Sequence, residues 1–333
     1  MTAPGHIPVM LNEVLAALAP VDGETYLDGT FGGGGYAQAI LSSAHCQLVA
    51  LDRDLDAIAR ADALAAREPR LQPLLGRFGR LDEIANDAGI QQVDGVVLDI
   101  GVSSFHLDEA ERGFSFQKDG PLDMRMGQDG PTAADVVNSL PDRALADIIF
   151  RLGEETKSRR IAKAVTARRV EAPFERTADL ANVVEVAVGG RRGAKTHPAT
   201  RTFQAIRMFI NNELGELADG LLAAERLLAP GGRLVVVTFH SLEDRIVKTF
   251  LRARSGGTGG GSRHVPESGK GAPPSFRLDS RKAVIVSPEE AEANPRARSA
   301  KLRVAVRTDA PPIGGVAWDG AGLPALGELE ISK

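Results

Sequence analysis

The chain has 333 residues, a net charge of −4 and a hydrophobic content of 43%. This length allows one large domain or two ordinary ones, and the hydrophobic content is sufficient for a packed core. The single cysteine, Cys46, excludes an internal disulfide and leaves no cysteine cluster for zinc. The N-terminus lacks the pattern of a secretory signal, and no apolar run approaches the roughly 18 residues of a membrane helix, so we expect a globular cytoplasmic protein.

A glycine-rich turn follows the first apolar strand that the sequence predicts, after a short predicted helix at 12–18. The strand ends at Asp28, five glycines occur within residues 29–35, and a helix is predicted from about Ala37. This order is typical of nucleotide-like ligand sites, because glycine lets a ligand approach the backbone. The acid before the first glycine resembles the Asp-x-Gly-x-Gly turn of S-adenosylmethionine (AdoMet) methyltransferases, whereas dinucleotide enzymes usually follow G-x-G-x-x-G. The turn therefore favours AdoMet over NAD, with a ligand-free flexible loop as the alternative.

Three further predicted strands end in, or are followed by, a residue suited to contact a ligand. The second strand ends at Asp52, about 20 residues past the turn, where a carboxylate can accept both hydroxyls of a ribose. Asp52 or Asp54 could instead cap the next helix, and we expect Asp54 to do so. Phe78 follows the third strand, where its ring either stacks beside an adenine or belongs to the core. The fourth strand ends at Asp99, and open parallel sheets bind ligands at this edge.

The pattern changes at about residue 109, after which helical periodicity continues to residue 185 without a strand. Between Arg143 and Arg207 there are fourteen Lys and Arg against seven Asp and Glu, a local charge of +7, which leaves −11 for the remainder of the chain. Such asymmetry predicts a surface for a polyanion, with a merely solvated surface as the alternative. Few aromatic residues lie among the basic ones, so phosphate contacts are expected rather than base stacking. The densest basic positions are Arg159, Arg160, Arg168, Arg169, Arg191, Arg192 and Lys195.

The C-terminal part returns to an alternation of helix and strand. Residues 202–228 predict one long helix that ends before Pro230, and an apolar strand follows at 233–239. Ser241 with Asp244 is expected to cap the next helix. For His240, local polar contacts are expected, with substrate contact as the alternative.

The last segments alternate between loops and short strands. Glycine and proline dominate residues 255–274, which predicts a flexible loop. Residues 282–286 and 301–307 predict a closing pair of strands, and the tail at 311–333 is rich in turn residues.

Several longer strings of consecutive residues indicate the protein family more specifically than any of these features. Distributed in order over residues 6–308, they closely resemble the bacterial 16S ribosomal RNA cytosine-N4 methyltransferase family. The strings are His6-Ile7-Pro8-Val9-Met10-Leu11, Asp28-Gly29-Thr30-Phe31-Gly32-Gly33-Gly34-Gly35, Asp99-Ile100-Gly101-Val102-Ser103-Ser104, Glu111-Arg112-Gly113-Phe114-Ser115-Phe116, Gly120-Pro121-Leu122-Asp123-Met124-Arg125-Met126, His197-Pro198-Ala199-Thr200-Arg201-Thr202-Phe203-Gln204-Ala205, Ser241-Leu242-Glu243-Asp244-Arg245 and Asn294-Pro295-Arg296-Ala297-Arg298-Ser299.

The resemblance implies an α/β fold, with a Rossmann-like, mostly parallel methyltransferase sheet of seven strands and an inserted all-helical substrate domain. We expect the sheet domain to comprise 1–108 and 198–310, and the insert to comprise 109–197 and to face the glycine turn across a cleft. The flexible loop is assigned to 255–274 and the tail to 311–333.

The resemblance also implies S-adenosyl-L-methionine as the cofactor and no metal. The residues that it places at the cofactor are Gly34, Gly35, Tyr36, Asp52, Phe78, Asp99 and His106. Two of them depart from the family pattern, because many members have His at the position of Tyr36 and Gln at the position of His106. Backbone contacts at Tyr36 are expected to persist, whereas an amide contact at His106 is lost.

The implied reaction is transfer of the AdoMet methyl group to the exocyclic N4 amine of a cytosine in 16S rRNA, in the decoding region of the small ribosomal subunit. No DNA or membrane partner is implied. Conjugation makes N4 weakly nucleophilic, so the site must accept its N–H bonds and orient it. Asp99 and Ser103 are the candidate catalytic residues, although Ser103 could simply belong to a turn or a helix start. The alternatives are a non-catalytic RNA-binding protein of ribosome assembly and an NAD-dependent Rossmann enzyme.

Overall fold

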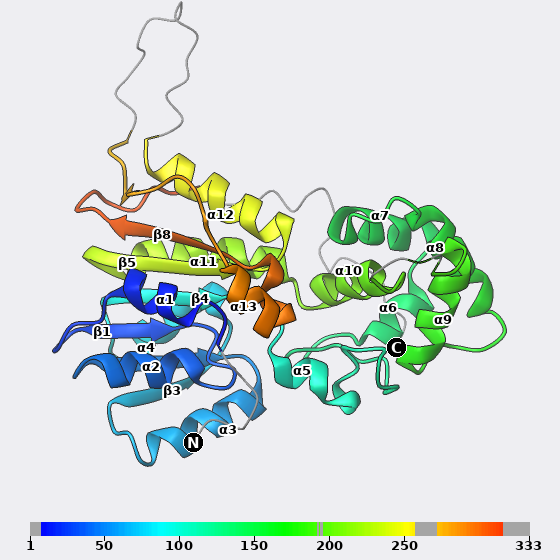
Figure 1. Cartoon of the computed structure of the whole chain (residues 1–333), viewed down its shortest axis with the longest axis horizontal. Helices are drawn as coiled ribbons and strands as arrows, with labels where there is room; N and C mark the ends of the chain where they lie inside the picture. Colours follow the sequence, from blue (N-terminus) through cyan, green and yellow to red (C-terminus); the bar gives the residue numbers. More distant parts are fainter. Residues whose placement is uncertain (1–7, 192, 194–195, 257–271, 316–333) are drawn as a thin grey trace, which may run out of the picture. The chain divides into compact units, whose positions relative to one another are not determined.

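The computed structural model describes residues 8–191, 193, 196–256 and 272–315 (Figure 1). The described chain divides into two compact units, one containing residues 8–101 and 215–315 and the other residues 102–214. We call them the sheet unit and the helical unit. The segment 109–197 lies within the helical unit, which begins before it and ends after it. Most of the loop predicted at 255–274 and of the tail predicted at 311–333 falls outside the described residues.

The sheet unit is built on one mostly parallel sheet, as predicted. Its strand order is β3-β2-β1-β4-β5-β8-β6, and β7 also pairs with β8. The first five strands in chain order run parallel, whereas β6, β7 and β8 join the edge antiparallel. Seven strands form this continuous order, as expected, and the two-residue β7 is an eighth that pairs beside it. The strands are β1 (Thr25–Asp28), β2 (Gln47–Asp52), β3 (Leu71–Leu75), β4 (Val93–Asp99), β5 (Leu228–Thr238), β6 (Phe276–Arg277), β7 (Val284–Ile285) and β8 (Lys301–Arg307).

The strand order reverses between β1 and β4, and this reversal determines where a ligand can bind. From β1 the chain proceeds outward through β2 and β3, and it then returns to the other side of β1 with β4 and β5. Because the connections diverge at this point, open parallel sheets leave a crevice outside the carboxyl ends of the two central strands. Asp28 ends β1 and Asp99 ends β4, so both carboxyl groups lie at the switch point.

Helices cover both faces of the sheet. One face carries α1 (Leu11–Leu18), α2 (Gly35–Ser43) and α3 (Leu55–Ala65), whose buried side chains form one cluster with those of the central strands. The other face carries α4 (Leu81–Asp87), α11 (Glu213–Leu227) and α12 (Ser241–Arg254) (Figure 1). Ion pairs support this second layer, because Arg226 of α11 contacts Asp82 of α4, and Asp244 of α12 contacts Arg303 of β8. The short α13 (Pro288–Ala293) and a 3₁₀ helix (Pro295–Ser299) precede β8.

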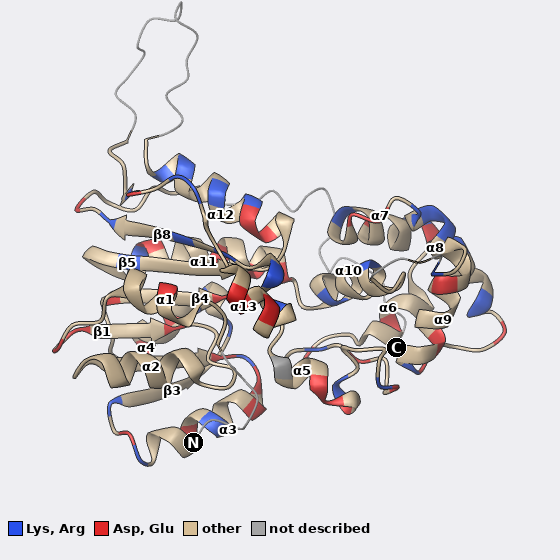
Figure 2. Ribbon diagram, viewed as in Figure 1, with Lys and Arg blue, Asp and Glu red and all other residues tan. Residues whose placement is uncertain are grey.

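The helical unit contains α5 (Ser104–Asp108), a 3₁₀ helix (Ala110–Arg112), α6 (Ala133–Ser139), α7 (Asp142–Gly153), α8 (Ser158–Arg168), α9 (Thr177–Val188) and α10 (Thr200–Ile210). Its core consists of the apolar faces of the last four helices, with α7 packed on α8 and α10, and α8 packed on α9. Gly153 permits the contact of α7 with α10, since a Cβ there would lie 2.5 Å from the carbonyl oxygen of Arg201. Figure 2 shows Lys and Arg concentrated along α8.

The predicted single helix over 202–228 is wrong, because the chain breaks at Asn211 and Asn212 into α10 and α11. Asn212 has a left-handed backbone (φ 49°), which asparagine tolerates better than most residues. The buried side chain of Asn211 bonds to a neighbouring loop, and a continuous apolar pattern cannot reveal this interaction. Within the described residues, no helix is both long and apolar enough to span a membrane.

Candidate active site

The glycine turn connects β1 to α2 and is shaped by contacts that only glycine allows. Gly34 is the N-cap of α2 and has a left-handed backbone (φ 75°), and its N–H donates to the carbonyl of Phe31 at 2.7 Å. A Cβ on Gly34 would lie 2.6 Å from the Phe31 ring, and one on Gly35 would lie 2.2 Å from Cγ of Pro8. Both glycines are therefore required by the packing of the turn itself. The N-terminus of α2, where backbone N–H groups can bind an anionic part of a ligand, thus follows directly from this turn.

Asp52 holds the turn from the end of β2. Its Oδ2 accepts the N–H of Gly32 at 2.8 Å, and its Oδ1 accepts the N–H of Asp54 at 2.9 Å. Asp54 caps α3 by accepting the N–H of Asp56 at 3.2 Å, which confirms the predicted cap. Asp52 thus lies beside the glycines, in the position from which a carboxylate could bind a ribose, and its role toward the cofactor stays a prediction.

Asp28 and Asp99 form a pair of carboxyl groups with buried oxygens at the switch point. Asp28 is fully buried, and its Oδ1 accepts the N–H of Thr30 at 3.1 Å. Oδ2 of Asp28 and Oδ1 of Asp99 are buried and have no hydrogen-bond partner among the described residues. Thr30 links the two strand ends, because its Oγ1 also accepts the N–H of Asp99 at 2.7 Å. Buried polar atoms are normally paired, so two orphaned oxygens at one strand edge indicate a place for a ligand.

The same burial changes the acidity of both carboxyl groups. Burial, reinforced by the charge of Asp52, raises the pKa of Asp28 from 3.8 to about 7. Burial, reinforced by the charges of Asp28 and Glu243, raises the pKa of Asp99 well above its usual range. A ligand that carries positive charge would relieve this repulsion and favour the ionised carboxylates.

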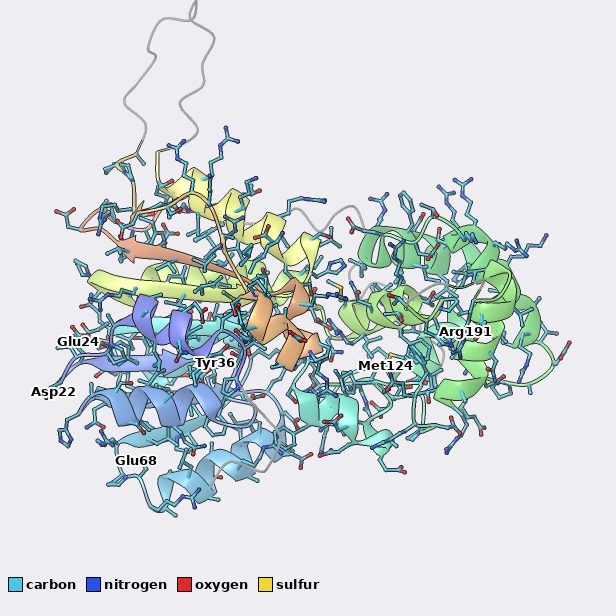
Figure 3. The ribbon with its side chains drawn as sticks, viewed as in Figure 1. Asp22, Glu24, Tyr36, Glu68, Met124 and Arg191 are labelled. Atoms are coloured by element: carbon cyan, nitrogen blue, oxygen red, sulfur yellow. The ribbon has the colours of Figure 1, made fainter. Side chains whose placement is uncertain are left out.

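Tyr36 lies in the first turn of α2 and is buried against the N-terminal segment (Figure 3). Its hydroxyl donates to the carbonyl of Val9, and the N–H of the next residue, Met10, donates to Oε1 of Glu290 at 2.7 Å. Burial raises the pKa of Tyr36, and the charges of Asp99 and Asp28 add to the shift, so the phenol is neutral and lies near both carboxyl groups. Tyr36, at the position where many family members have His, thus anchors the N-terminal segment over the turn.

Phe78 lies next to the beginning of the glycine turn. It starts a 3₁₀ helix (Phe78–Arg80) and is partly exposed. A Cβ on Gly29 would lie 3.4 Å from Cβ of Phe78, and a Cβ on Gly220 of α11 would lie 2.5 Å from its ring. The ring therefore packs on α11 beside the turn, and the expected contact with adenine stays a prediction.

Ser103 and His106 belong to the helical unit, unlike the other predicted site residues. Ser103 is the N-cap of α5, and its Oγ accepts the N–H of His106 at 3.3 Å. The imidazole of His106 is buried and stacks on the ring of Phe114, with centroids 4.8 Å apart and planes inclined by 16°. Both side chains thus have local structural roles, and their proposed roles at the cofactor or the substrate are expectations.

The cap of α12 differs from the one predicted. His240, not Ser241, is the N-cap, and its Nδ1 accepts the N–H of Leu242 at 3.3 Å. Glu243 completes the capping box by accepting the N–H groups of Phe239 and His240 at 2.8 and 2.9 Å. The expected local role of His240 is confirmed, whereas Asp244 pairs with Arg303 and Lys301 of β8. The sequence did not single out Glu243, although its buried carboxylate acts on Asp99.

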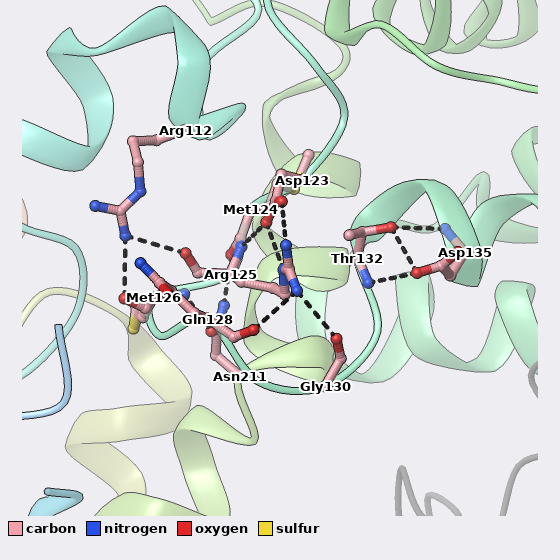
Figure 4. A network of polar contacts seen from close by, with 10 residues as sticks. All are labelled: Arg112, Asp123, Met124, Arg125, Met126, Gln128, Gly130, Thr132, Asp135 and Asn211. Carbon is pink, nitrogen blue, oxygen red and sulfur yellow. Dashed lines mark hydrogen bonds and ion pairs between the residues drawn. The ribbon is translucent and has the colours of Figure 1, made fainter. Parts of the chain in front are cut away.

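The strings of the helical unit form a network of polar contacts around Asn211 (Figure 4). Asn211 Oδ1 accepts the N–H of Met126 at 2.8 Å, and its amide donates to the carbonyls of Met124 and Arg207 at 2.8 and 2.9 Å. Arg112 donates to the carbonyls of Arg125 and Met126 at 3.2 and 3.0 Å. These bonds hold Met124 in a left-handed conformation (φ 61°) that costs free energy for a non-glycine residue.

Two neighbouring groups of residues complete this framework. Arg207 forms a bidentate ion pair with Glu213, with both distances 2.7 Å. His197 contacts the ring of Phe116 at 4.5 Å between centroids, and its Nε2 lies 3.1 Å from Glu185. Arg112 and Arg207 therefore support the fold of the unit and are poor candidates for free RNA-binding cations.

The sheet topology, the glycine turn and the orphaned carboxyl oxygens together define an AdoMet-dependent methyltransferase. AdoMet carries a sulfonium and an ammonium group, and two carboxyl groups that each have one buried oxygen without a described partner suit a ligand with positive charge. A family model described as "MraW methylase family" matches residues 3–308, and the chain belongs to this family.

Curated relatives agree over nearly the whole chain, and all three below are named "Ribosomal RNA small subunit methyltransferase H". The relative from Hyphomonas neptunium is 66% identical over 99% of this chain and 96% of its own length. The relative from Paramagnetospirillum magneticum is 57% identical over 96% of this chain and 99% of its own length. The relative from Caulobacter vibrioides strain NA1000 is 56% identical over 97% of this chain and 100% of its own length.

Proposed function

We propose that the protein transfers the methyl group of AdoMet to the exocyclic N4 amine of a cytosine in 16S rRNA, within the small ribosomal subunit in the cytoplasm. The observation that carries the proposal is the pair of buried carboxyl oxygens of Asp28 and Asp99, which lack partners and lie beside the glycine turn at the switch point. The names of the relatives support a small-subunit rRNA substrate.

The residues proposed to hold the cofactor surround the turn. The backbone at Gly34, Gly35 and Tyr36 would receive the methionine portion, Asp52 would accept the ribose hydroxyls, and Phe78 would contact the adenine. Asp99 and His106 complete the proposed set. When bound, AdoMet supplies an electrophilic methyl group, and the departing sulfur needs no protonation because it leaves as a neutral thioether.

Asp99 is the residue best suited to handle the amine. The N4 lone pair is conjugated with the ring, and accepting an N–H bond of the amine would orient that lone pair toward the methyl carbon. Formation of the N–C bond leaves a positive charge on N4, and one N–H proton must then be lost. Raising the pKa of a carboxyl group makes its ionised form a stronger base, and the ionised form of Asp99 would accept this proton. Ser103 is a weaker candidate, because its Oγ already caps α5.

The decisive experiment is transfer of labelled methyl groups from AdoMet to small subunits from a strain that lacks this modification. Digestion to nucleosides followed by mass spectrometry should place the label in N4-methylcytidine. Label in another nucleoside, or none in RNA, would contradict the proposal. Equilibrium binding of AdoMet but not NAD would exclude the Rossmann dehydrogenase, and catalytic turnover would exclude a purely RNA-binding protein.

A further inference from the structure

The most basic stretch of the helical unit is α8 with its two flanking residues. Residues 157–169 contain six Lys and Arg and no acidic residue. Three of these cations are exposed and have no side-chain partner among the described residues, whereas the other three are bonded within the unit. The bonded cations stabilise the packing of the unit, whereas the exposed ones are available to bind a ligand.

The engaged cations hold α8 against its neighbours. Lys157 Nζ donates to the carbonyl of Val188 at 2.9 Å, at the end of α9. Arg168 pairs with Asp179 of α9 at 2.7 Å and stacks its guanidinium over the Phe174 ring. Arg169 donates to the carbonyls of Val137 and Leu140 at 2.8 and 2.7 Å, which ties α8 to α6.

The available cations are Arg159, Arg160 and Lys163. All three are exposed, and none has an ion pair or side-chain hydrogen bond with any described residue. The opposite face of α8 is buried, so its position in the unit is fixed by packing. Like charges at positions i and i+4 disfavour an isolated helix, so Arg159 and Lys163 gain nothing from each other. A bound anion would relieve this repulsion.

An exposed aromatic ring lies at the same corner of the unit. Phe150, in the last turn of α7, has 55% of its surface exposed, although other α7 side chains fill the core. Only four residues connect the last turn of α7, which carries Phe150, to the first turn of α8, which carries Arg159 and Arg160. Arg201 of α10 reaches the same connection and donates to the carbonyl of Glu154 at 3.3 Å. Figure 2 shows basic residues at this α7–α8 corner, which we define as Phe150, Arg159, Arg160, Lys163 and Arg201.

We propose that the α7–α8 corner binds a single-stranded part of the RNA substrate, with phosphates at Arg159, Arg160 and Lys163 and an unpaired base stacked on Phe150. The inference rests on the proposed function. The N4 amine of cytosine donates a hydrogen bond in a C·G pair, so the amine must be unpaired to be methylated. Unpaired RNA is bound through cations along its backbone and aromatic faces for its bases, and this corner presents both.

The corner is better suited to this role than the other basic cluster. Arg191 is paired with Glu185 at 3.2 Å, whereas Arg192 and Lys195 lie outside the described residues. The sequence predicts phosphate contacts rather than base stacking, because few aromatic residues lie among the basic ones. The exposed ring of Phe150 adds a site for base stacking, and sequence composition alone does not show which aromatic side chains are exposed.

The test compares two triple variants with equal changes of charge. Arg159→Ala/Arg160→Ala/Lys163→Ala removes the proposed phosphate contacts, and Arg67→Ala/Lys248→Ala/Lys282→Ala removes exposed cations from the sheet unit. Binding to small subunits and to a single-stranded oligoribonucleotide is measured across a salt series. The first variant should bind about 10-fold or more weakly at moderate salt, and its slope of log affinity against log salt should be flatter by about 2, from roughly 0.7 per phosphate contact. Equal losses in both variants, or lines parallel to the parent, would overturn the proposal.

Phe150 is tested separately. Phe150→Leu keeps an apolar side chain but removes the ring, and we expect about 5-fold or weaker binding of the oligoribonucleotide, whereas Leu75→Ala in the sheet unit should have no effect. Phe150→Trp in a Trp318→Phe background should be quenched by the bound base, and unchanged emission at saturation would contradict stacking. AdoMet affinity should be unchanged in every corner variant. Failure of the parent protein to methylate rRNA would refute the proposed function, whereas an active parent with unaffected corner variants would refute only this inference.

Discussion

The two units differ in how the polar groups of their sequence strings are satisfied. In the sheet unit, the turn and strand ends leave buried oxygens of Asp28 and Asp99 without a protein partner. In the helical unit, the side chains of Asn211 and Arg112 form hydrogen bonds to the backbone of Met124 and Met126 and so fix the conformation of this loop. Residue strings that are equally typical of the family thus have different roles in the structure. One set leaves buried oxygens without a described partner, and the other maintains the shape of the unit.

This difference shows where ligand-binding cations should be sought. Arg112 and Arg207 belong to family strings, yet their guanidinium groups are bonded to backbone carbonyls and to Glu213. Arg159, Arg160 and Lys163 belong to no string, yet they are the cations of α8 that the described residues leave unpaired. A cation that is bonded within its own fold supports that fold, whereas an exposed cation without a described partner is available to bind an anion.

The largest effect is expected on stability, from Asn211→Ala in the helical unit. The variant loses three hydrogen bonds, two of them buried, and leaves the N–H of Met126 without an acceptor, so the free energy of unfolding should fall by about 2–4 kcal/mol. Denaturant titration measures the change, and amide exchange should show the loop around Met124 opening. Asn182→Ala on the exposed side of α9 is the control and should change little. If both variants were equally stable, Asn211 would not organise the loop.

In the sheet unit, Asp52→Ala should weaken AdoMet binding by about 1.5–3 kcal/mol, the typical value for losing hydrogen bonds to a charged group. Part of this loss would come from the turn, because Asp52 also accepts the N–H of Gly32. Calorimetry measures the affinity. Asp54→Asn, which can keep the cap of α3, is the matched control, and a larger loss in that variant would move the ribose contact from Asp52 to Asp54.

A smaller, pH-dependent effect is expected from Asp28→Asn. The folded protein holds the pKa of Asp28 at about 7, above its ordinary value of 3.8, so the unfolded chain ionises at lower pH than the native one. Its contribution to stability is therefore greatest at low pH and is lost as pH rises through the folded pKa. Between about pH 5.5 and about pH 8, parent stability should fall by about 2 kcal/mol relative to the variant.

Denaturant titrations of both proteins at the two pH values measure this difference. Asp62→Asn removes the same charge from the exposed surface of α3 and serves as the control. A difference between parent and Asp28→Asn that does not vary with pH would show that Asp28 is ionised throughout. The inference that burial raises the pKa of Asp28 would then be wrong.

Much of the sheet unit could be predicted because its strands are short apolar runs that end at polar residues. Asp28, Asp52 and Asp99 follow directly from this pattern, as does the cap at Asp54. The break at Asn211 could not be predicted, since its cause is a bond to Met126, 85 residues away in the sequence. For the same reason, the sequence could not distinguish Arg168, which pairs with Asp179, from Arg159 and Arg160.

The most direct test of a cofactor-binding sheet unit and an RNA-binding helical unit is to measure both affinities on the same three proteins. Labelled AdoMet and small ribosomal subunits are titrated into the parent, Asp52→Ala and Arg159→Ala/Arg160→Ala/Lys163→Ala. We predict that Asp52→Ala loses affinity for AdoMet and keeps affinity for the subunit, and that the triple variant shows the reverse. Loss of both affinities together in either variant, or of neither in both, would contradict this division of roles.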